Sequence, residues 1–302
     1  MATAVVIMGC STGFGLGLMK AVLQSPAIMD PTSKRKLFLL LTSSKERCIQ
    51  SWKSTYVEVC GKPFHMNIED DTITVIIEEG NLEDFDCLGK TSDIIKLAFS
   101  QFHFPIAEYF IFLNSGSVTP VGHILAKGPS FSSSGSGYID GDSFDEQLHR
   151  HSNLNFVAFT TIARTILRVI LKRELPHSGV AIRVVNVSSI AAIKDLPGMS
   201  IYGATKAARE AIMRGIASEL ESEYPQLDSR VLSYAPGPME TEMVTRDLTH
   251  PDCPDNFMKQ AKSAISFIEC DESARKCLRL LTDMSSLSKW KSGDRVDFYD
   301  DI

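Results

Sequence analysis

The stretch that decides the fold is residues 4–15, Ala-Val-Val-Ile-Met-Gly-Cys-Ser-Thr-Gly-Phe-Gly. Its five apolar residues, Ala4–Met8, are typical of a strand that is buried on both faces, and Gly9 ends the run. Three more glycines follow, and the apolar residues after them predict a helix that Pro26 and Pro31 end. A strand, a glycine-rich turn and a helix in this order predict an anion site. Glycine lets the backbone approach a phosphate, and the free N–H groups at a helix N-terminus bind it.

The spacing of these glycines is Gly-x3-Gly-x-Gly, whereas the dinucleotide fingerprint is Gly-x-Gly-x2-Gly. Two interpretations therefore stay open for the turn: a dinucleotide-binding turn, or a plain glycine-rich connection between a strand and a helix. Its place on the first strand favours the former. The residues expected at the cofactor are Gly9, Ser11, Thr12, Gly13, Phe14 and Gly15.

Strand-like and helix-like segments alternate through the rest of the chain. Apolar runs predict strands at 37–41, 73–77, 109–113, 182–187 and 230–234, and helical patterns lie at 45–52, 94–102, 155–175 and 204–223. This alternation predicts an α/β fold: a doubly wound parallel sheet of the Rossmann type with helices on both faces. Because no repeat or linker divides the chain, we expect a single domain over residues 1–302. The Gly/Ser-rich segment 127–143 predicts a mobile loop within it.

Composition excludes several classes of protein. The chain has 302 residues, 44% of them hydrophobic and 23% charged, which is typical of a globular protein. Its net charge of −6 argues against nucleic acid and anionic membranes as partners. The apolar runs at 37–41 and 109–113 are too short to cross a bilayer, and the opening residues predict no signal peptide. Seven cysteines at irregular spacing predict reduced thiols in a cytoplasmic protein, with no disulfide framework and no zinc site.

The second predicted strand ends in Thr42-Ser43-Ser44-Lys45. A carboxylate at this point would bind the ribose 2′-hydroxyl of NAD, and this strand end has none. The hydroxyls of Ser43 and Ser44, beside Lys45 and Arg47, suit a 2′-phosphate, which predicts NADP(H) rather than NAD. The alternative is that Lys45 and Arg47 only solvate the start of a helix.

The most specific pattern is Ser189 followed by Tyr202 and Lys206. Tyr202 and Lys206 are four residues apart at the start of a predicted helix, so they share one face. A phenol has a reference pKa of about 10, and a neighbouring ammonium group lowers it by stabilising the phenolate. Ser189 ends a predicted strand at the carboxyl edge of the sheet, where open α/β sheets bind their ligands. The three residues therefore predict a catalytic site for proton transfer.

Taken together, these residues resemble the short-chain dehydrogenase/reductase family. The resemblance spans nearly the whole chain and adds segments 230–238 and 292–300, which are similar to the branch of the family that reduces pterins. The chain departs from that branch at Thr12 and Ser43, where arginines are usual, and at Leu196 and Met199, where aromatic residues are usual.

The resemblance implies NADPH-dependent reduction of the side-chain ketone of a pterin, a step of tetrahydrobiopterin synthesis. Tyr202 would protonate the developing alkoxide and Ser189 would hydrogen-bond the same oxygen. Lys206 would hold the nicotinamide ribose and lower the pKa of Tyr202, and Asn155 would position a water in the proton relay. Asp297 would bind the amino-pyrimidine edge of the pterin, in a tail anchored by Val296, Phe298 and Tyr299.

The remaining expectations complete the site. No metal is expected, and His149 and His151 are interpreted as a solvated helix entrance. Further cofactor-binding residues are expected at Asn81, Leu82, Asn114, Ser115, Gly116, Tyr202, Lys206, Pro236, Gly237 and Met239. The substrate-binding residues are expected to be Ser189, Leu196, Met199, Tyr202, Gly237 and Asp297.

Two further interpretations of function stay open. One is a general NADPH-dependent reductase of dicarbonyls or ketones, and the other is a dinucleotide-sensing regulatory protein without turnover. The intact set of Ser189, Tyr202 and Lys206 favours an enzyme. The apolar residues of segments 155–175 and 204–223 predict a homodimer that pairs through these two helices.

Overall fold

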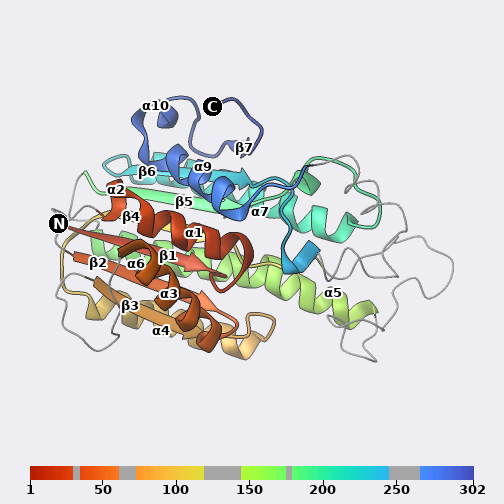
Figure 1. Ribbon diagram of the computed structural model, residues 1–302, viewed down its shortest axis with the longest axis horizontal. Coiled ribbons are helices and arrows are strands. Elements are labelled where there is room, and N and C mark those ends of the chain that lie inside the picture. The colour runs from red at the N-terminus through yellow and green to blue at the C-terminus, as the bar shows by residue number, and fades with distance from the viewer. Residues whose placement is uncertain (30–34, 61–72, 119–143, 175–178, 245–265) are drawn as a thin grey trace.

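The computed structural model describes residues 1–29, 35–60, 73–118, 144–174, 179–244 and 266–302. Within them, a parallel sheet of seven strands runs in the order β3-β2-β1-β4-β5-β6-β7 (Figure 1). The strands are β1 (Ala2–Met8), β2 (Arg35–Thr42), β3 (Ile73–Glu79), β4 (Ile106–Leu113), β5 (Ala181–Val187), β6 (Asp228–Ala235) and β7 (Arg295–Asp297). The strand order reverses between β1 and β4, which is the place where such sheets bind ligands.

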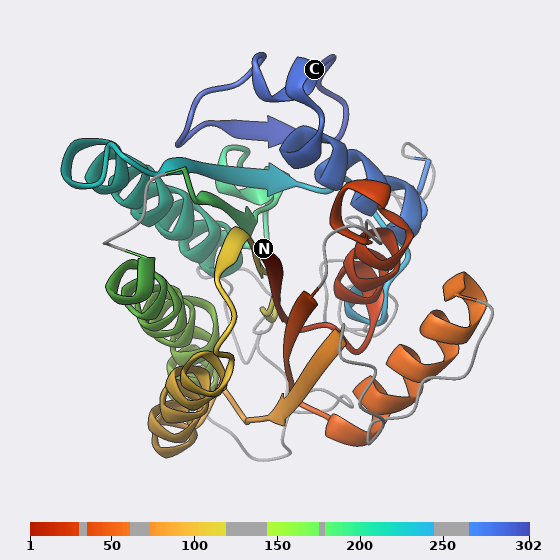
Figure 2. The ribbon, with the colours of Figure 1, turned by 90° about the vertical axis from the view of Figure 1, so that its left-hand side faces the viewer.

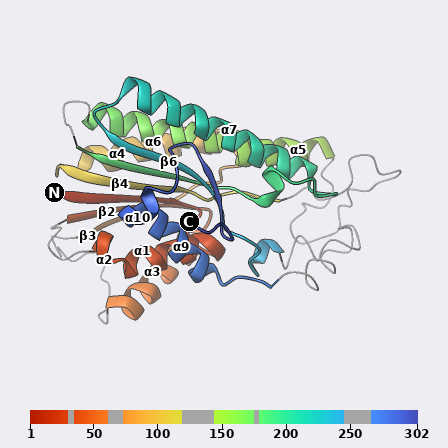
Figure 3. The ribbon, with the colours of Figure 1, turned by 90° about the horizontal axis from the view of Figure 1, so that it is seen from above.

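Helices cover both faces of the sheet, as Figures 2 and 3 show. One face carries α1 (Gly13–Gln24), α2 (Pro26–Met29), α3 (Lys45–Cys60) and α9 (Cys270–Thr282). The other carries α4 (Phe85–Gln101), α6 (Phe159–Glu174) and α7 (Ser200–Glu223). The remaining helical segments are α5 (Phe144–Ser152), the π-helical turn η1 (Asn153–Ala158), the 3₁₀ turn η2 (Ile190–Ala192) and α10 (Met284–Leu287). The predicted doubly wound α/β fold is confirmed.

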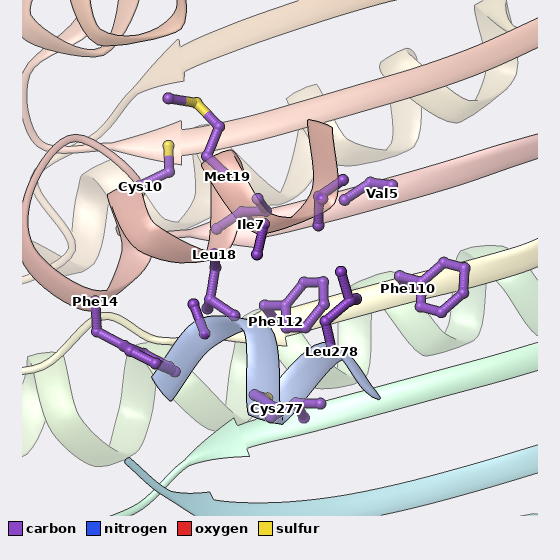
Figure 4. Close-up of a cluster of buried hydrophobic side chains, with 14 of the residues drawn as sticks. Val5, Ile7, Cys10, Phe14, Leu18, Met19, Phe110, Phe112, Cys277 and Leu278 are labelled. Carbon is purple, nitrogen blue, oxygen red and sulfur yellow. The ribbon is translucent and has the colours of Figure 1, made fainter. Parts of the chain in front are cut away.

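The sheet is buried between two apolar layers because side chains alternate along each strand. On β1, Val5 and Ile7 point into the layer below α1 and α9, which Figure 4 shows around Phe112 and Leu278. Ala4 and Val6 point the other way, into the layer below α4, α6 and α7. Continuous apolar runs such as 4–8 are the sequence signature of this double burial.

The structure differs from the predicted elements in three places. Pro26 begins the short helix α2 as well as following the end of α1. The helix predicted at 155–175 begins at Phe144 and passes through the π-helical turn that contains Asn155. Strand β7 was not predicted, because three residues give no periodic signal. The predicted loop at 127–143 lies outside the described residues.

The continuous helical stretch Phe144–Glu174 is long and apolar enough to cross a membrane by length and composition alone. The apolar runs at 37–41 and 109–113 did not indicate this stretch, because its apolar residues are interspersed with polar ones. Half of the most apolar 18 residues of this stretch are buried inside the protein, and Ile162, Ile166 and Ile170 among them pack against the sheet. Packing against the sheet accounts for this composition.

We predict that Gly17→Ala destabilises the fold. A methyl group at Gly17 on α1 would lie 2.9 Å from the carbonyl oxygen of Cys270, which begins α9. Relieving this overlap moves one helix against the other, at a cost of roughly 1–3 kcal/mol. The matched control is Gly89→Ala in α4, where a methyl group meets nothing within 4 Å. That change should stabilise the helix by about 0.5–1 kcal/mol. Urea unfolding of both variants measures the difference, and equal stabilities would contradict the assigned packing.

Candidate active site

The turn between β1 and α1 depends on close backbone approach. Gly9 and Gly13 have positive φ angles of 79° and 54°, which favour glycine. A side-chain carbon at Gly15 would lie 1.8 Å from the carbonyl oxygen of Gly9, so only glycine fits there. Thr12, in an extended conformation, precedes the first turn of α1, which contains no acidic residue. The helix N-terminus therefore presents free N–H groups without a competing negative charge, which fits a dinucleotide pyrophosphate.

The end of β4 lies beside this turn. The Asn114 side chain donates a hydrogen bond of 2.7 Å to the Gly9 carbonyl oxygen, which joins the two strand ends across the switch point. Ser115 and Gly116 follow directly, so three of the predicted cofactor residues line the same edge. Phe14 contributes differently: its ring packs in the core against Tyr234, with centroids 6.1 Å apart, and only its backbone can face a cofactor.

A carboxylate lies at the end of β2, contrary to the sequence-based expectation. It belongs to Glu79 at the end of the neighbouring strand β3, and it accepts a hydrogen bond of 2.6 Å from the backbone N–H of Lys45. Arg47 forms an exposed ion pair of 3.5 Å with Glu242. The Ser43 side chain is exposed. The backbone N–H of Ser44 donates a hydrogen bond of 3.1 Å to the Thr42 hydroxyl. Both cations expected at a 2′-phosphate thus have an acidic neighbour.

The other predicted cofactor residues lie on two further strand ends. Asn81 and Leu82 follow β3, and the Asn81 side chain caps its own turn by accepting from the Glu83 N–H at 3.2 Å. Pro236, Gly237 and Met239 follow β6. Gly237 has a positive φ of 82°, and Met239 is buried in the core.

Ser189, Tyr202 and Lys206 meet at the carboxyl edge of the sheet, as predicted. Ser189 follows β5 and caps η2 by accepting from the Ala191 N–H at 3.2 Å. Tyr202 and Lys206 lie on the first turns of α7 and are 8% and 3% exposed. The Lys206 ammonium group is 5.5 Å from the centre of the Tyr202 ring and donates a hydrogen bond of 2.7 Å to the Val187 carbonyl oxygen. Tyr202 and Lys206 are therefore buried together, and the partly exposed Ser189 lies beside them.

The environment sets the protonation of this group. Burial raises the pKa of Tyr202 above its usual value, and the Ser189 hydroxyl and the charge of Arg209 oppose that rise. Burial, followed by the charge of Arg209, lowers the pKa of Lys206 well below its usual value. The prediction that Lys206 lowers the pKa of Tyr202 is not what this structure gives: Ser189 and Arg209 have that effect, and burial outweighs them. Tyr202 is consequently a protonated phenol at neutral pH.

Asn155 is fully buried in the π-helical turn, and its side chain is engaged on both sides. The amide donates to the Ser117 carbonyl oxygen at 2.9 Å, and the side-chain oxygen accepts from the Ser117 N–H at 3.1 Å. His151 lies 3.1 Å from the amide and 3.1 Å from the Thr205 hydroxyl, and it is 2% exposed. The interpretation of His151 as a solvated helix entrance was therefore wrong, because α5 turns this residue into the protein.

The predicted substrate residues Leu196 and Met199 gather beside Tyr202 in a small apolar cluster with Val118 and Ala191. Three further members lie in the segment between β6 and α9. Sequence reasoning missed them, since they carry no motif: Met243, Val244 and Phe267. This cluster gives Tyr202 an apolar neighbourhood, which is the physical cause of its raised pKa.

Asp297 ends β7, and the pairing of β7 with β6 brings it to the same edge of the sheet. Its carboxylate is held by both terminal nitrogens of Arg295. Arg295 also donates to the Ser189 carbonyl oxygen at 3.1 Å and to Glu210 at 2.9 Å, and Glu210 in turn accepts from the Ser188 hydroxyl. Of the predicted anchors, Val296 is buried, whereas Tyr299 is 65% exposed and does not anchor the tail. Sequence reasoning did not identify Arg295 or Glu210.

Comparison with known proteins agrees with this geometry. A family model described as short chain dehydrogenase matches residues 139–252. The sepiapterin reductase of Bos taurus is 33% identical over 158 residues, which are 51% of this chain and 54% of that protein. The sepiapterin reductase of Xenopus tropicalis is 38% identical over 119 residues, or 39% and 42% of the two chains. The chain thus spans about half the length of the curated relatives it matches.

Solved structures show the same fold over nearly the whole chain. A short-chain dehydrogenase from Sphingobium yanoikuyae, solved in complex with NADPH, has a TM-score of 0.64 at 18% identity and covers 99% of this chain and 89% of its own. Levodione reductase has a TM-score of 0.64 at 18% identity, with coverage of 98% and 95%.

In residues 139–252 the chain is similar to the short-chain dehydrogenase/reductase family, and Ser189, Tyr202 and Lys206 all lie within this matched segment. Within this family, the pterin-reducing branch to which its sequence is similar is that of the sepiapterin reductases.

Proposed function

We propose that the protein is an NADPH-dependent carbonyl reductase. The observation that carries the proposal is the buried pair of Tyr202 and Lys206 with Ser189 beside it, at the same sheet edge as a helix N-terminus whose first turn has no acidic residue. A protein that only binds a dinucleotide has no need of a buried phenol and ammonium group in this arrangement. The match of residues 139–252 to the short chain dehydrogenase model, and the NADPH bound in one solved structure of the same fold, support this proposal.

The cofactor-binding residues and the proton-donating residues of this site have separate roles. NADPH supplies a hydride when bound, and the glycine turn with Asn114 and Ser115 would hold it. Tyr202 is protonated at neutral pH and donates its proton to the oxygen of the substrate, while the Ser189 hydroxyl orients that oxygen. The carbonyl of Val187 holds the Lys206 ammonium group in place beside the phenol.

We further propose a pterin side-chain ketone as the substrate, which would give the enzyme a role in tetrahydrobiopterin synthesis. Support comes from the sepiapterin reductases among its relatives and from the position of Asp297, which Arg295 joins to the Ser189 carbonyl oxygen. Two parallel hydrogen bonds from an amino-pyrimidine edge match a carboxylate.

A small ketone or dicarbonyl is the second candidate for the substrate. The pair between Arg295 and Asp297 favours it, because this pair already occupies the carboxylate that a pterin would need. The apolar cluster around Met199 also accepts a small ketone without any charged contact.

We propose in addition a cytoplasmic homodimer that does not depend on nucleic acid or a membrane. Free thiols at Cys10, Cys48, Cys87, Cys270 and Cys277 support a reducing compartment. Partly exposed apolar residues on η1, α6 and α7 support an apolar pairing surface between two copies: Phe156, Val157, Val169, Ile212 and Ile216.

Turnover of NADPH tests the proposed function. The absorbance of NADPH should fall when NADPH is mixed with the protein and sepiapterin, and a simple diketone in parallel tests the second candidate substrate.

Tyr202→Phe should lower kcat by about 10²–10⁴-fold and leave NADPH binding within a few-fold, because the phenol acts only during the reaction. Tyr299→Phe, at a 65% exposed tyrosine, is the control and should be fully active. A Tyr202→Phe variant that keeps a tenth of the activity contradicts the assigned role, and NADPH binding without any turnover supports the sensing protein.

Cofactor preference should favour NADPH over NADH in kcat/KM. Lys45 and Arg47 attract the 2′-phosphate, whereas Glu79 opposes it through its negative charge. Glu79→Gln should therefore increase the preference for NADPH, and Arg47→Ala should reduce it. Steady-state kinetics with both cofactors measure these ratios. Equal kcat/KM for NADPH and NADH in the wild type would refute the preference, and a Glu79→Gln ratio unchanged from wild type would remove Glu79 from the site.

Asp297→Ala separates the two candidate substrates. It should weaken turnover of a pterin by about 2–4 kcal/mol, roughly 30- to 1,000-fold, because charged hydrogen bonds in a desolvated site are lost. A small diketone makes no such contact, so its kcat/KM should change little. Equal losses on both substrates would assign Asp297 a structural role through Arg295, and no loss on either would remove it from the substrate site.

A further inference from the structure

Arg209 is a buried cation that has no carboxylate partner within the described ranges. It lies one turn beyond Lys206 on α7 and is 0% exposed. Among the described residues, no carboxylate lies within ion-pair distance of it, because its neighbour Glu210 pairs with Arg295 and Ser188. Its Nη1 has no hydrogen-bond partner in the described part of the chain. Burial lowers the pKa of Arg209 to about 10, so the group stays charged at neutral pH. A buried unpaired charge is costly and calls for a compensating role.

The contacts of Arg209 all lie behind the candidate active site. Its Nε donates to the backbone oxygen of Asn155, and Nη2 donates to the Asn155 side-chain oxygen at 3.3 Å. Nη2 also donates to the Ser115 carbonyl oxygen at 2.9 Å. The guanidinium group stacks 4.5 Å from the centre of the Phe159 ring, which replaces part of its hydration. One side chain thus ties α7 to the π-helical turn and to the cofactor edge after β4.

This arrangement changes the expected role of Asn155. Family resemblance assigns Asn155 to the positioning of a relay water, yet both of its oxygens accept from Arg209 here. An arginine does not release its proton at neutral pH, so it cannot take part in a proton relay itself. What it supplies is fixed geometry and a permanent positive charge.

We propose that Arg209 is a positioning residue of the active site. It holds Asn155 and Ser115 in place and keeps a positive charge beside Tyr202 and Lys206, which favours the phenolate that forms when Tyr202 gives up its proton. This inference rests on the proposed reductase function only for its effect on turnover.

Several other charged or titratable groups lie around this centre. They are Lys206 and Glu210 on α7, His151 on α5, and Arg295 and Asp297 on β7. Arg295 is neutralised by Glu210 and Asp297, and Lys206 has a lowered pKa. Among the described residues, neither Arg209 nor Lys206 has a carboxylate partner, and Arg209 is the one of the two that stays charged well above neutral pH.

The experiment follows the titration of Tyr202 directly, by NMR of protein labelled with ¹³C at the tyrosine ring carbon that bears oxygen. The protein has seven tyrosines, and Tyr202→Phe identifies the signal. Arg209→Met should raise the titration midpoint of Tyr202 by about one pH unit, since an uncharged side chain of similar length removes a nearby positive charge. Arg214→Met, at an exposed arginine of the same helix, is the matched control and should leave the midpoint unchanged. A wild-type midpoint in Arg209→Met overturns the electrostatic role.

Arg209→Lys tests positioning separately from charge. It should keep the midpoint of Tyr202 but lower kcat about tenfold at unchanged KM, because an ammonium group cannot reach Asn155 and Ser115 together. Wild-type kcat in Arg209→Lys overturns the positioning role, and this variant decides the question if Arg209→Met does not fold. If the wild type turns over no carbonyl compound, the proposed function fails, whereas the tyrosine titration still gives its own answer on Arg209.

Discussion

The contact between Gly15 and the carbonyl of Gly9 is the constraint on which the rest of the structure depends. Because no side chain fits between them, the chain can fold back from β1 into α1 at once, and the helix N-terminus points at the switch point of the sheet. The same carbonyl accepts the Asn114 amide, which brings the end of β4 to the turn. Ser115 follows, its carbonyl accepts from Arg209, and Arg209 holds Asn155. A tight turn near the N-terminus is in this way connected, contact by contact, to the helix that carries Tyr202 and Lys206.

Helix α7 concentrates the electrostatics of the site on one buried face. Three successive turns carry Tyr202, then Lys206, then the adjacent pair Arg209 and Glu210. Each of these side chains is at most 8% exposed. Such burial is unfavourable for each charge alone, and the structure offsets it in different ways: a backbone carbonyl for Lys206, an aromatic ring and carbonyls for Arg209, and an arginine for Glu210. The phenol lies among these charges in apolar surroundings, which is why burial and Arg209 have opposite effects on its pKa.

The fold and the catalytic trio could be predicted from the sequence because both are local patterns. The continuous apolar run Ala4–Met8 indicates a strand that is buried on both faces. The four-residue spacing of Tyr202 and Lys206 indicates that both side chains lie on one face of a helix. Glu79, His151 and Arg295 could not be assigned in this way, since their roles arise from neighbours that are distant in sequence. Glu79 lies at Lys45 because β3 pairs with β2, and Arg295 reaches Ser189 because a three-residue strand joins the sheet edge. Arg209 comes three residues after Lys206, in a helical turn whose other residues, Ala207 and Ala208, are small. An arginine in such a turn is a sequence feature that indicates a specific role.

The attachment of β7 has a consequence for how the protein loses function on heating. This strand is three residues long, lies at the edge of the sheet, and holds the carbonyl of Ser189 through Arg295 across 106 positions of sequence. Short edge strands open at a lower free energy than the core of a sheet. Fraying of β7 would release Ser189 and Glu210 while the other six strands stay paired. Inactivation would then precede loss of secondary structure, so the resistance of this site to heat is set by its weakest strand rather than by the stability of the whole sheet.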